Sequence, residues 1–166
     1  MTIELVLAIS LTIGISALCS TLEAMILSIT VAEVESLKEK SPKKGKILEK
    51  FKVELEETSS AILSLNTIAN TLGATLVGGL AEKTFGSHDN SLLIFAIGMT
   101  LGILFFSEIL PKNLAVSYRY EMASKLVVPL ALVRWCMAPI SKICKVTVRA
   151  IVPPKDKESE SDEQEI

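Results

Sequence analysis

The chain has 166 residues, of which 49% are hydrophobic, 22% are charged and 5% are aromatic, and its formal net charge is −2. A mean hydropathy of +0.47 is too high for an ordinary soluble domain of this size and indicates a membrane protein. Aromatic residues are few and no basic patch contains them, which argues against nucleic-acid binding, and the three cysteines form neither a disulfide framework nor a close metal pair.

The first predicted element is a membrane-spanning helix over residues 3–29, since a bilayer core needs about 20 predominantly apolar residues. It has no basic region before it and no small-residue cleavage site after it, so we expect it to be retained rather than removed as a signal peptide. The next segment, residues 31–58, balances seven lysines with seven glutamates and contains breaks at Ser41-Pro42 and at Gly45. We expect this segment to form two short polar helices in a hairpin.

Two further stretches, residues 59–81 and 91–110, are long enough to span and carry almost no charge. The link between them contains a single basic residue, Lys83, whereas the hairpin segment and the chain after residue 111 are rich in lysine and arginine. Basic residues favour the cytoplasmic side of a membrane. The N-terminus and residues 82–90 are therefore predicted to lie outside, and the hairpin and the C-terminus in the cytoplasm.

A fourth apolar stretch, residues 126–140, is shorter and has Arg134 at its middle. If it crossed the bilayer, the three basic residues that follow it would lie outside, so we expect an interfacial or juxtamembrane helix with Arg134 reaching toward the headgroups. The predicted fold class is thus an all-α integral membrane domain, residues 1–152, with three transmembrane helices, a cytoplasmic helical hairpin after the first, and a juxtamembrane helix. Residues 153–166 are expected to form a disordered acidic tail.

Polar side chains recur at helical spacing inside the predicted spans, where they are costly and therefore indicate function. In the first span two serines and Glu23 follow one another at i, i+4 and i+7, and two asparagines and Gly73 have the same spacing in the second, so each set shares one helical face. The candidate metal ligands are Ser16, Ser20, Asn66, Asn70, Ser107 and Glu108.

Depth along the helices supports a common site. At about 1.5 Å rise per residue, Ser20 and Asn70 fall at similar heights near the bilayer middle. Glu108 lies shallower unless the third helix continues past Pro111. That proline has no N–H, so in an α-helix it leaves the carbonyl of Ser107 without a donor and adds a backbone oxygen to the set.

These ligands are oxygen atoms only, which suits a hard cation such as Mg²⁺, Ca²⁺ or Na⁺ and argues against zinc or copper. Structural roles remain open beside this one. Serines in spans also bond back to their own helix, and asparagines one turn apart also join helices. Glu23 is the weakest candidate and can instead pair with a basic residue near the inner face.

Three motifs, SALCSTLEAMILS, LSLNTIANTLGA and SEILPKNLAVSYRYEMA, together resemble the transmembrane domain of the CNNM/CorC family of magnesium transporters over about residues 3–150. The resemblance implies a homodimer, an outside N-terminus and Mg²⁺ export coupled to Na⁺ entry. It also implies an ion site made by Ser16, Ser20, Asn70 and Glu108, with Asn66 close by. A GxxxG at Gly98 and Gly102 also permits close helix approach within or between protomers.

Two departures limit the resemblance. Ala17 stands where several relatives have a glycine, which weakens the expectation of a local backbone opening in the first span. Relatives usually continue into cytoplasmic CBS modules that bind nucleotide, and residues 1–166 contain no such module, so nucleotide regulation is not carried over. A cytoplasmic regulatory domain would belong to a longer form of the protein.

The predicted function is that of a divalent cation transporter, with Na⁺-coupled Mg²⁺ efflux through a largely dehydrated site. The alternative is a membrane-embedded Mg²⁺ sensor or scaffold without net transport, which the sequence does not separate from the first. An enzyme is not expected, because the spans contain no paired aspartates, no histidine and no serine beside a base.

Overall fold

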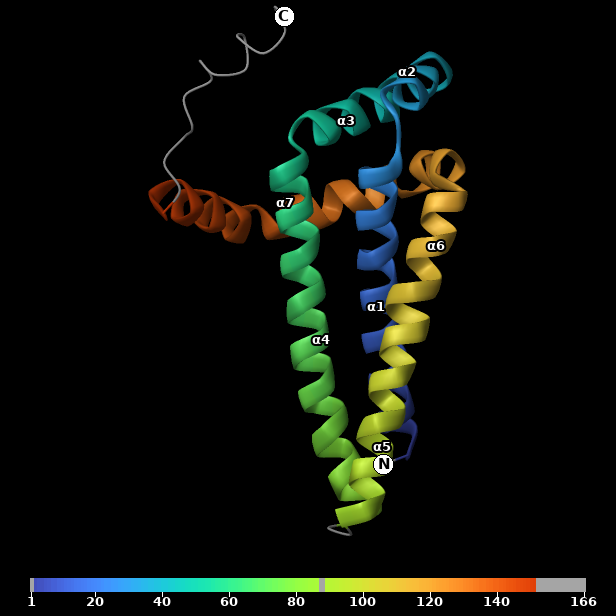
Figure 1. The fold of residues 1–166 in the computed structure, drawn as a ribbon, viewed down its shortest axis with the longest axis vertical. Coiled ribbons are helices and arrows are strands. Elements are labelled where there is room, and N and C mark those ends of the chain that lie inside the picture. The colour runs from blue at the N-terminus through green and yellow to red at the C-terminus, as the bar shows by residue number, and fades with distance from the viewer. Residues whose placement is uncertain (1, 87–88, 152–166) are drawn as a thin grey trace, which may run out of the picture.

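The computed structural model describes residues 2–86 and 89–151, within which every regular element is a helix (Figure 1). The predicted acidic tail, residues 153–166, and the predicted domain end at residue 152 lie outside the described residues. In chain order the elements are α1 (Thr2–Ser28), α2 (Val31–Lys40), α3 (Pro42–Val53), α4 (Leu55–Phe85), α5 (Asp89–Gly102), the π-helix η1 (Ile103–Ile109), α6 (Leu110–Ser117) and α7 (Arg119–Ile151).

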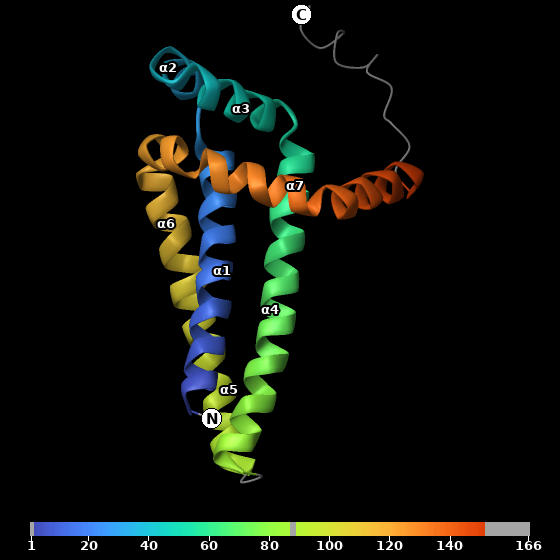
Figure 2. The ribbon, with the colours of Figure 1, turned by 180° about the vertical axis from the view of Figure 1, so that it is seen from behind.

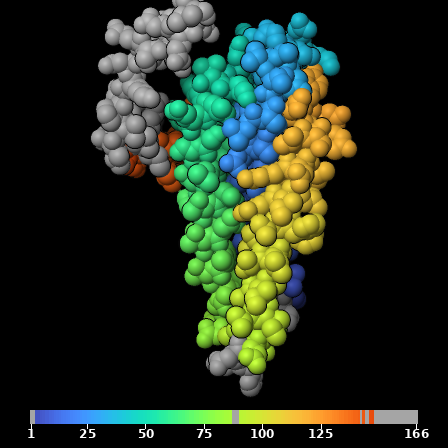
Figure 3. All heavy atoms as spheres, viewed as in Figure 1, coloured from blue at the N-terminus to red at the C-terminus, as the bar shows by residue number. Residues whose placement is uncertain are grey.

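Three long helical segments, α1, α4 and the continuous run α5–η1–α6, lie side by side in both views (Figures 1 and 2). Figure 3 shows α1, in blue, between α4 and α6 at the end of the bundle that carries the hairpin. Four stretches are long and apolar enough to cross a membrane, namely Ile3–Ser28, Leu55–Phe85, Asn90–Ser117 and Arg119–Ser141. The prediction of an all-helical membrane protein is confirmed, and the fourth stretch also meets the length and composition of a span.

The predicted hairpin of two short helices is confirmed, but the predicted break at Gly45 is wrong. α2 begins with a capping box in which Thr30 and Glu33 satisfy each other's backbone N–H groups, and Pro42 occupies the first turn of α3, where no N–H is needed. Gly45 does not break a helix but lies inside α3. A Cβ at Gly45 would come within 2.6 Å of the backbone of Lys38, so the missing side chain lets α2 and α3 pack closely.

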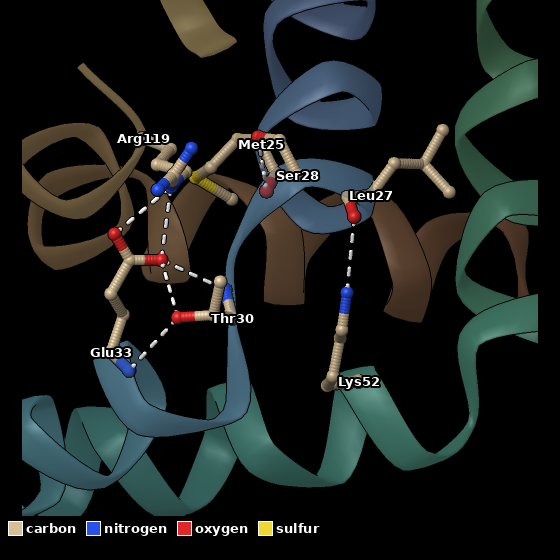
Figure 4. A network of polar contacts seen from close by, with 7 residues as sticks. All are labelled: Met25, Leu27, Ser28, Thr30, Glu33, Lys52 and Arg119. Atoms are coloured by element: carbon tan, nitrogen blue, oxygen red, sulfur yellow. Dashed lines mark hydrogen bonds and ion pairs between the residues drawn. The ribbon is translucent and has the colours of Figure 1, made fainter. Parts of the chain in front are cut away.

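Polar contacts tie the hairpin to the rest of the bundle (Figure 4). The ammonium of Lys52 donates hydrogen bonds to the carbonyls of Ile26 and Leu27, at 2.9 and 3.2 Å, and so caps the last turn of α1. Glu33 accepts two hydrogen bonds from Arg119 at the start of α7. The Thr30 N–H and the Arg119 guanidinium hold the pKa of Glu33 below its ordinary value, whereas burial lowers the pKa of Lys52.

Helix α7 is longer than the predicted stretch 126–140 and continues through both of its prolines. It runs across the three long segments near the hairpin end of the bundle (Figures 1 and 2). Arg134 does not reach toward headgroups, contrary to expectation. Its guanidinium forms an ion pair with Glu54 at the start of α4, donates to Thr58 Oγ1 at 2.8 Å and lies over the ring of Phe51. It therefore fastens α7 to the corner between α3 and α4.

Replacing Arg134 with methionine is expected to destabilise the fold. The arginine side chain is only 13% exposed, and its removal leaves the carboxylates of Glu54 and Glu57 without this cation. Breaking a fully buried pair costs about 3–5 kcal/mol, and because Glu54 is partly exposed we expect about 2 kcal/mol here. Thermal unfolding in detergent, followed by the fluorescence of the single tryptophan, Trp135, measures the loss. The same change at the exposed Lys46 should leave the midpoint unchanged, and equal midpoints for the two variants would contradict the assignment.

The third long segment changes its winding before Pro111. In η1 the backbone N–H groups bond five residues back, as in the bond from Leu110 to the carbonyl of Phe105. The next donor in that pattern would be Pro111, which has no N–H, so the π-helix ends there and α6 follows. The helix thus continues to Ser117, nine residues beyond Glu108, which removes the expected shallowness of that carboxylate.

Candidate cation site

The predicted polar residues of α1 and α4 meet inside the bundle. Ser16 is buried and its hydroxyl donates a hydrogen bond of 2.9 Å to Asn66 Oδ1. The same oxygen accepts a second bond, at 3.4 Å, from the Nδ2 of Asn70 one turn further along α4. Asn66 therefore joins the two helices and fixes the orientation of the Asn70 amide.

Besides the hydroxyl of Ser59, two oxygen atoms of candidate ligands are buried and have no hydrogen-bond partner among the described residues. They are the hydroxyl of Ser20 and the Oδ1 of Asn70. Burying a polar group without a partner costs roughly 1–3 kcal/mol in proteins. Such a cost is recovered when a ligand supplies the missing contact, so each of these two oxygens is a candidate ligand position.

Ser107 brings the third segment against α1, about one turn from Ser16. It is buried in η1, and its hydroxyl donates a hydrogen bond of 3.3 Å to the carbonyl of Ile13 on α1. Ser107 and Ser16 thus both give their proton to a carbonyl oxygen. The lone pairs of the two hydroxyl oxygens are left to accept from another donor or to coordinate a cation.

Glu108 follows Ser107 in η1 and is half-buried. Among the described residues no cation lies within ion-pair distance of its carboxylate, and no side chain donates a hydrogen bond to it. Glu23 behaves differently, because its Oε2 lies 3.0 Å from the ammonium of Lys112 on α6. This pair is the structural role that the sequence left open for Glu23.

The predicted common level of Ser20 and Asn70 is wrong, because the two residues lie about 12 Å, or two turns, apart along the bundle. The bond from Ser16 to Asn66 places these two residues at the same height, and α1 and α4 run in opposite directions. Ser20 therefore lies nearer the hairpin than Asn66, and Asn70 lies further from it. About half of this offset arises because α4 begins at Leu55 rather than at residue 59, so Asn70 is about 22 Å from the start of its helix.

Close packing of α1 and α4 beside the asparagines depends on Gly73. A Cβ at this position would lie 2.3 Å from Oγ1 and 2.9 Å from Cβ of Thr12, so no larger residue fits without moving a helix. Thr12 is buried and bonds its hydroxyl to its own helix, at the carbonyl of Ala8. The sequence placed Gly73 on the polar face of α4 but gave no sign that Thr12 is its neighbour.

The candidate donors are of the chemical kind that suits a small hard cation. They are one carboxylate, one amide oxygen and three serine hydroxyls from three helical segments, although Ser20 lies about two turns from Asn70. Oxygen donors of this kind are the ligands of Mg²⁺, Ca²⁺ and Na⁺. No group of three or more histidine, cysteine, aspartate or glutamate side chains occurs in the described part of the chain. A cation here would therefore be held by one full negative charge and by neutral dipoles.

Sequence reasoning missed Lys112 as a partner of this region. The available signal was its place four residues after Glu108 and one after Pro111, where a lysine is within reach of any carboxylate at the edge of the site.

Comparison with known proteins agrees with the sequence motifs. The family model described as the Cyclin M transmembrane N-terminal domain matches residues 7–166. A UPF0053 protein of Synechocystis is 28% identical over 138 residues, which are 83% of this chain and 39% of that protein. A DUF21 domain-containing protein of Arabidopsis thaliana, described as chloroplastic, is 30% identical over 138 residues, 82% of this chain and 20% of its own length.

The chain thus spans two fifths or less of the length of these relatives. The match to the family model nevertheless covers nearly all of it and includes the three motifs that carry the resemblance. The protein belongs to the CNNM family, and residues 7–166 correspond to its transmembrane N-terminal domain.

Proposed function

We propose that the protein transports Mg²⁺ across a membrane, with efflux coupled to Na⁺ entry. Family membership supports this proposal, because CNNM and DUF21 membrane domains are linked to divalent cation transport. The observation that carries it is the buried, unpartnered Oδ1 of Asn70, at the level of α1 where Ser107 contacts Ile13. Glu108, next to Ser107, is half-buried and has no cation partner among the described residues.

In the proposed site, Glu108 supplies the charge, and Ser16, Ser107 and Asn70 supply neutral oxygens. Ser20 lies about two turns from Asn70 along the bundle, so it does not touch the same ion in this arrangement of the helices. Mg²⁺ loses its water reluctantly and prefers six oxygens at about 2.0–2.1 Å, so a set with a single carboxylate replaces hydration water while keeping affinity low enough for release. Asn66 acts through its neighbours, since its Oδ1 already accepts two hydrogen bonds. The carbonyl of Ser107 is a further oxygen beside Glu108.

The same proposal includes the topology. α1, α4 and α5–α6 cross the membrane, the hairpin lies in the cytoplasm and α7 lies along the cytoplasmic interface. The direction of α7 across the bundle and the attachment of Arg134 to Glu54 support this arrangement over a fourth span. The exposed apolar residues along α5 and η1, among them Leu93, Ile97 and Leu101, are available to lipid or to a second copy in a homodimer.

Flux through reconstituted vesicles tests the proposal. Purified protein in liposomes loaded with Mg²⁺ should release the ion faster when Na⁺ is supplied outside. Asn70→Ala should slow this release roughly 10- to 100-fold, because a polar contact to a charged group is worth about 1.5–3 kcal/mol. Thr67→Ala is the matched control, since Thr67 is exposed on α4 and bonds only to its own helix at the carbonyl of Leu63.

Unchanged flux in the Asn70 variant would refute the site. A sensor or scaffold would give a different result, in which Mg²⁺ binds in calorimetry and Asn70→Ala weakens that binding, yet the wild-type vesicles release no ion. Calorimetric titration with Ca²⁺ and Mn²⁺ beside Mg²⁺ measures the selectivity of the site.

A further inference from the structure

Lys112 lies one helical turn after Glu108, in the position where a lysine commonly pairs with a glutamate. A glutamate followed by a lysine at i+4 is the more favourable order for such a pair. Side chains on a helix also lean toward its N-terminus, which would carry Lys112 toward Glu108. The structure shows another partner, because the ammonium of Lys112 lies 3.0 Å from Glu23 on α1.

The contacts along α1 show that Lys112 reaches away from Glu108. Ser107 touches α1 at Ile13, whereas Lys112 touches it at Glu23, ten residues further toward the hairpin. Ten residues of α1 correspond to about 15 Å along its axis, while residues 107 and 112 are separated by about half of that. The lysine side chain therefore extends toward the hairpin end, against the ordinary lean of a helical side chain.

We propose that Glu23 is a positioning residue that holds Lys112 away from Glu108 and so leaves the Glu108 carboxylate free for a divalent cation. This inference rests on the proposed function, since it assumes that Glu108 binds the ion. Glu23 is 26% and Lys112 47% exposed, and partly exposed ion pairs add little to stability. The main effect of the pair is therefore on where the positive charge of Lys112 lies.

Without Glu23, the i, i+4 spacing puts the carboxylate of Glu108, one turn back in the same helical segment, within reach of Lys112. An ammonium on Glu108 would compete with a divalent cation for the same oxygens and would neutralise the only full negative charge of the proposed site. The lysine would act as a tethered competitor, and its removal should then restore binding. This rescue separates a positioning role from a merely structural one.

Calorimetric titration of the full chain in detergent with MgCl₂ tests the inference. Glu23→Gln should raise the apparent Kd roughly tenfold, the factor expected when the site is free about one tenth of the time. Lys112→Met alone should bind at least as tightly as the wild type. The double variant Glu23→Gln/Lys112→Met should recover the wild-type Kd, with circular dichroism confirming that all variants keep their helical content.

Three results would overturn the inference. An unchanged Kd in Glu23→Gln would show that Lys112 does not move to Glu108. Equally weak binding in the single and double variants would show that Glu23 acts directly, and loss of helical content in both would make the pair structural. The Glu108→Gln variant distinguishes failure of the proposed function, because wild-type Mg²⁺ affinity in that variant would remove Glu108 from the site regardless of Glu23.

Discussion

Glu108→Gln is expected to abolish Mg²⁺ transport and to weaken Mg²⁺ binding more than 100-fold. The substitution keeps the size of the side chain and removes the only full charge among the proposed ligands. At an effective dielectric constant of about 20, two unit charges 4 Å apart attract by about 4 kcal/mol, and a divalent ion doubles this value before the cost of desolvation. Even a third of that energy is close to the roughly 2.7 kcal/mol that a 100-fold change requires.

Glu82→Gln is the matched control for this prediction, because Glu82 is an exposed carboxylate near the C-terminal end of α4, away from the hairpin. It should retain wild-type binding and flux. Both variants should unfold at the wild-type temperature, since Glu108 has neither an ion pair nor a hydrogen-bond donor among the described side chains. Wild-type flux in Glu108→Gln vesicles would exclude Glu108 as a ligand and with it the proposed site.

Gly73→Ala should both destabilise the protein and impair transport. Its new Cβ would lie 2.9 Å from the Cβ of Thr12, an atom that cannot move without its helix. Inserting a methyl group into such a contact costs about 1–3 kcal/mol, since α1 and α4 must separate. Asn70 lies one turn away on α4, so separation would also lengthen the contact between Ser16 and Asn66. Thermal unfolding and vesicle flux measure the two effects.

Gly78→Ala provides the comparison, because a Cβ at Gly78 meets nothing within 4 Å. Alanine is the better helix former by about 1 kcal/mol, so this variant should be as stable as the wild type or more so. Substitution by alanine is thus expected to change the stability in opposite directions at the two glycines, although both lie in α4. A stable and active Gly73→Ala would show that the helices are less tightly packed than the structure indicates.

Much of the fold follows from charge and apolar length. Lysines and glutamates are interspersed in equal number over residues 31–58, and Pro42 fixes the start of α3, so the hairpin and its corner were predictable. The role of Gly45 was not, because glycine serves both to end helices and to let them touch, and only the position of Lys38 decides between these roles. The contacts of Arg134 were not predictable either, because its partners Glu54 and Glu57 lie about 80 residues away in the chain.

The helical faces on which the candidate residues lie were predictable from their spacing, whereas their contacts were not. Ser16, Ser20 and the two asparagines share helical faces, and that periodicity is visible in the sequence. The register between α1 and α4 depends on where α4 begins, which hydropathy placed four residues too late. Which amide oxygen is satisfied and which is left unpaired depends on that register, so the distinction between Asn66 and Asn70 came only from the structure.

A π-turn takes one residue more than an α-turn, and η1 holds this surplus between Ile103 and Ile109. Each residue of an α-helix advances the chain by about 100° around the axis. If the π-turn moved along the segment, the side chains of the residues it passed would rotate about the helix axis by about that angle. Both ends of the segment would stay in place. Glu108 lies within η1, so such a movement would turn its carboxylate from one side of the segment to another without displacing any long helix.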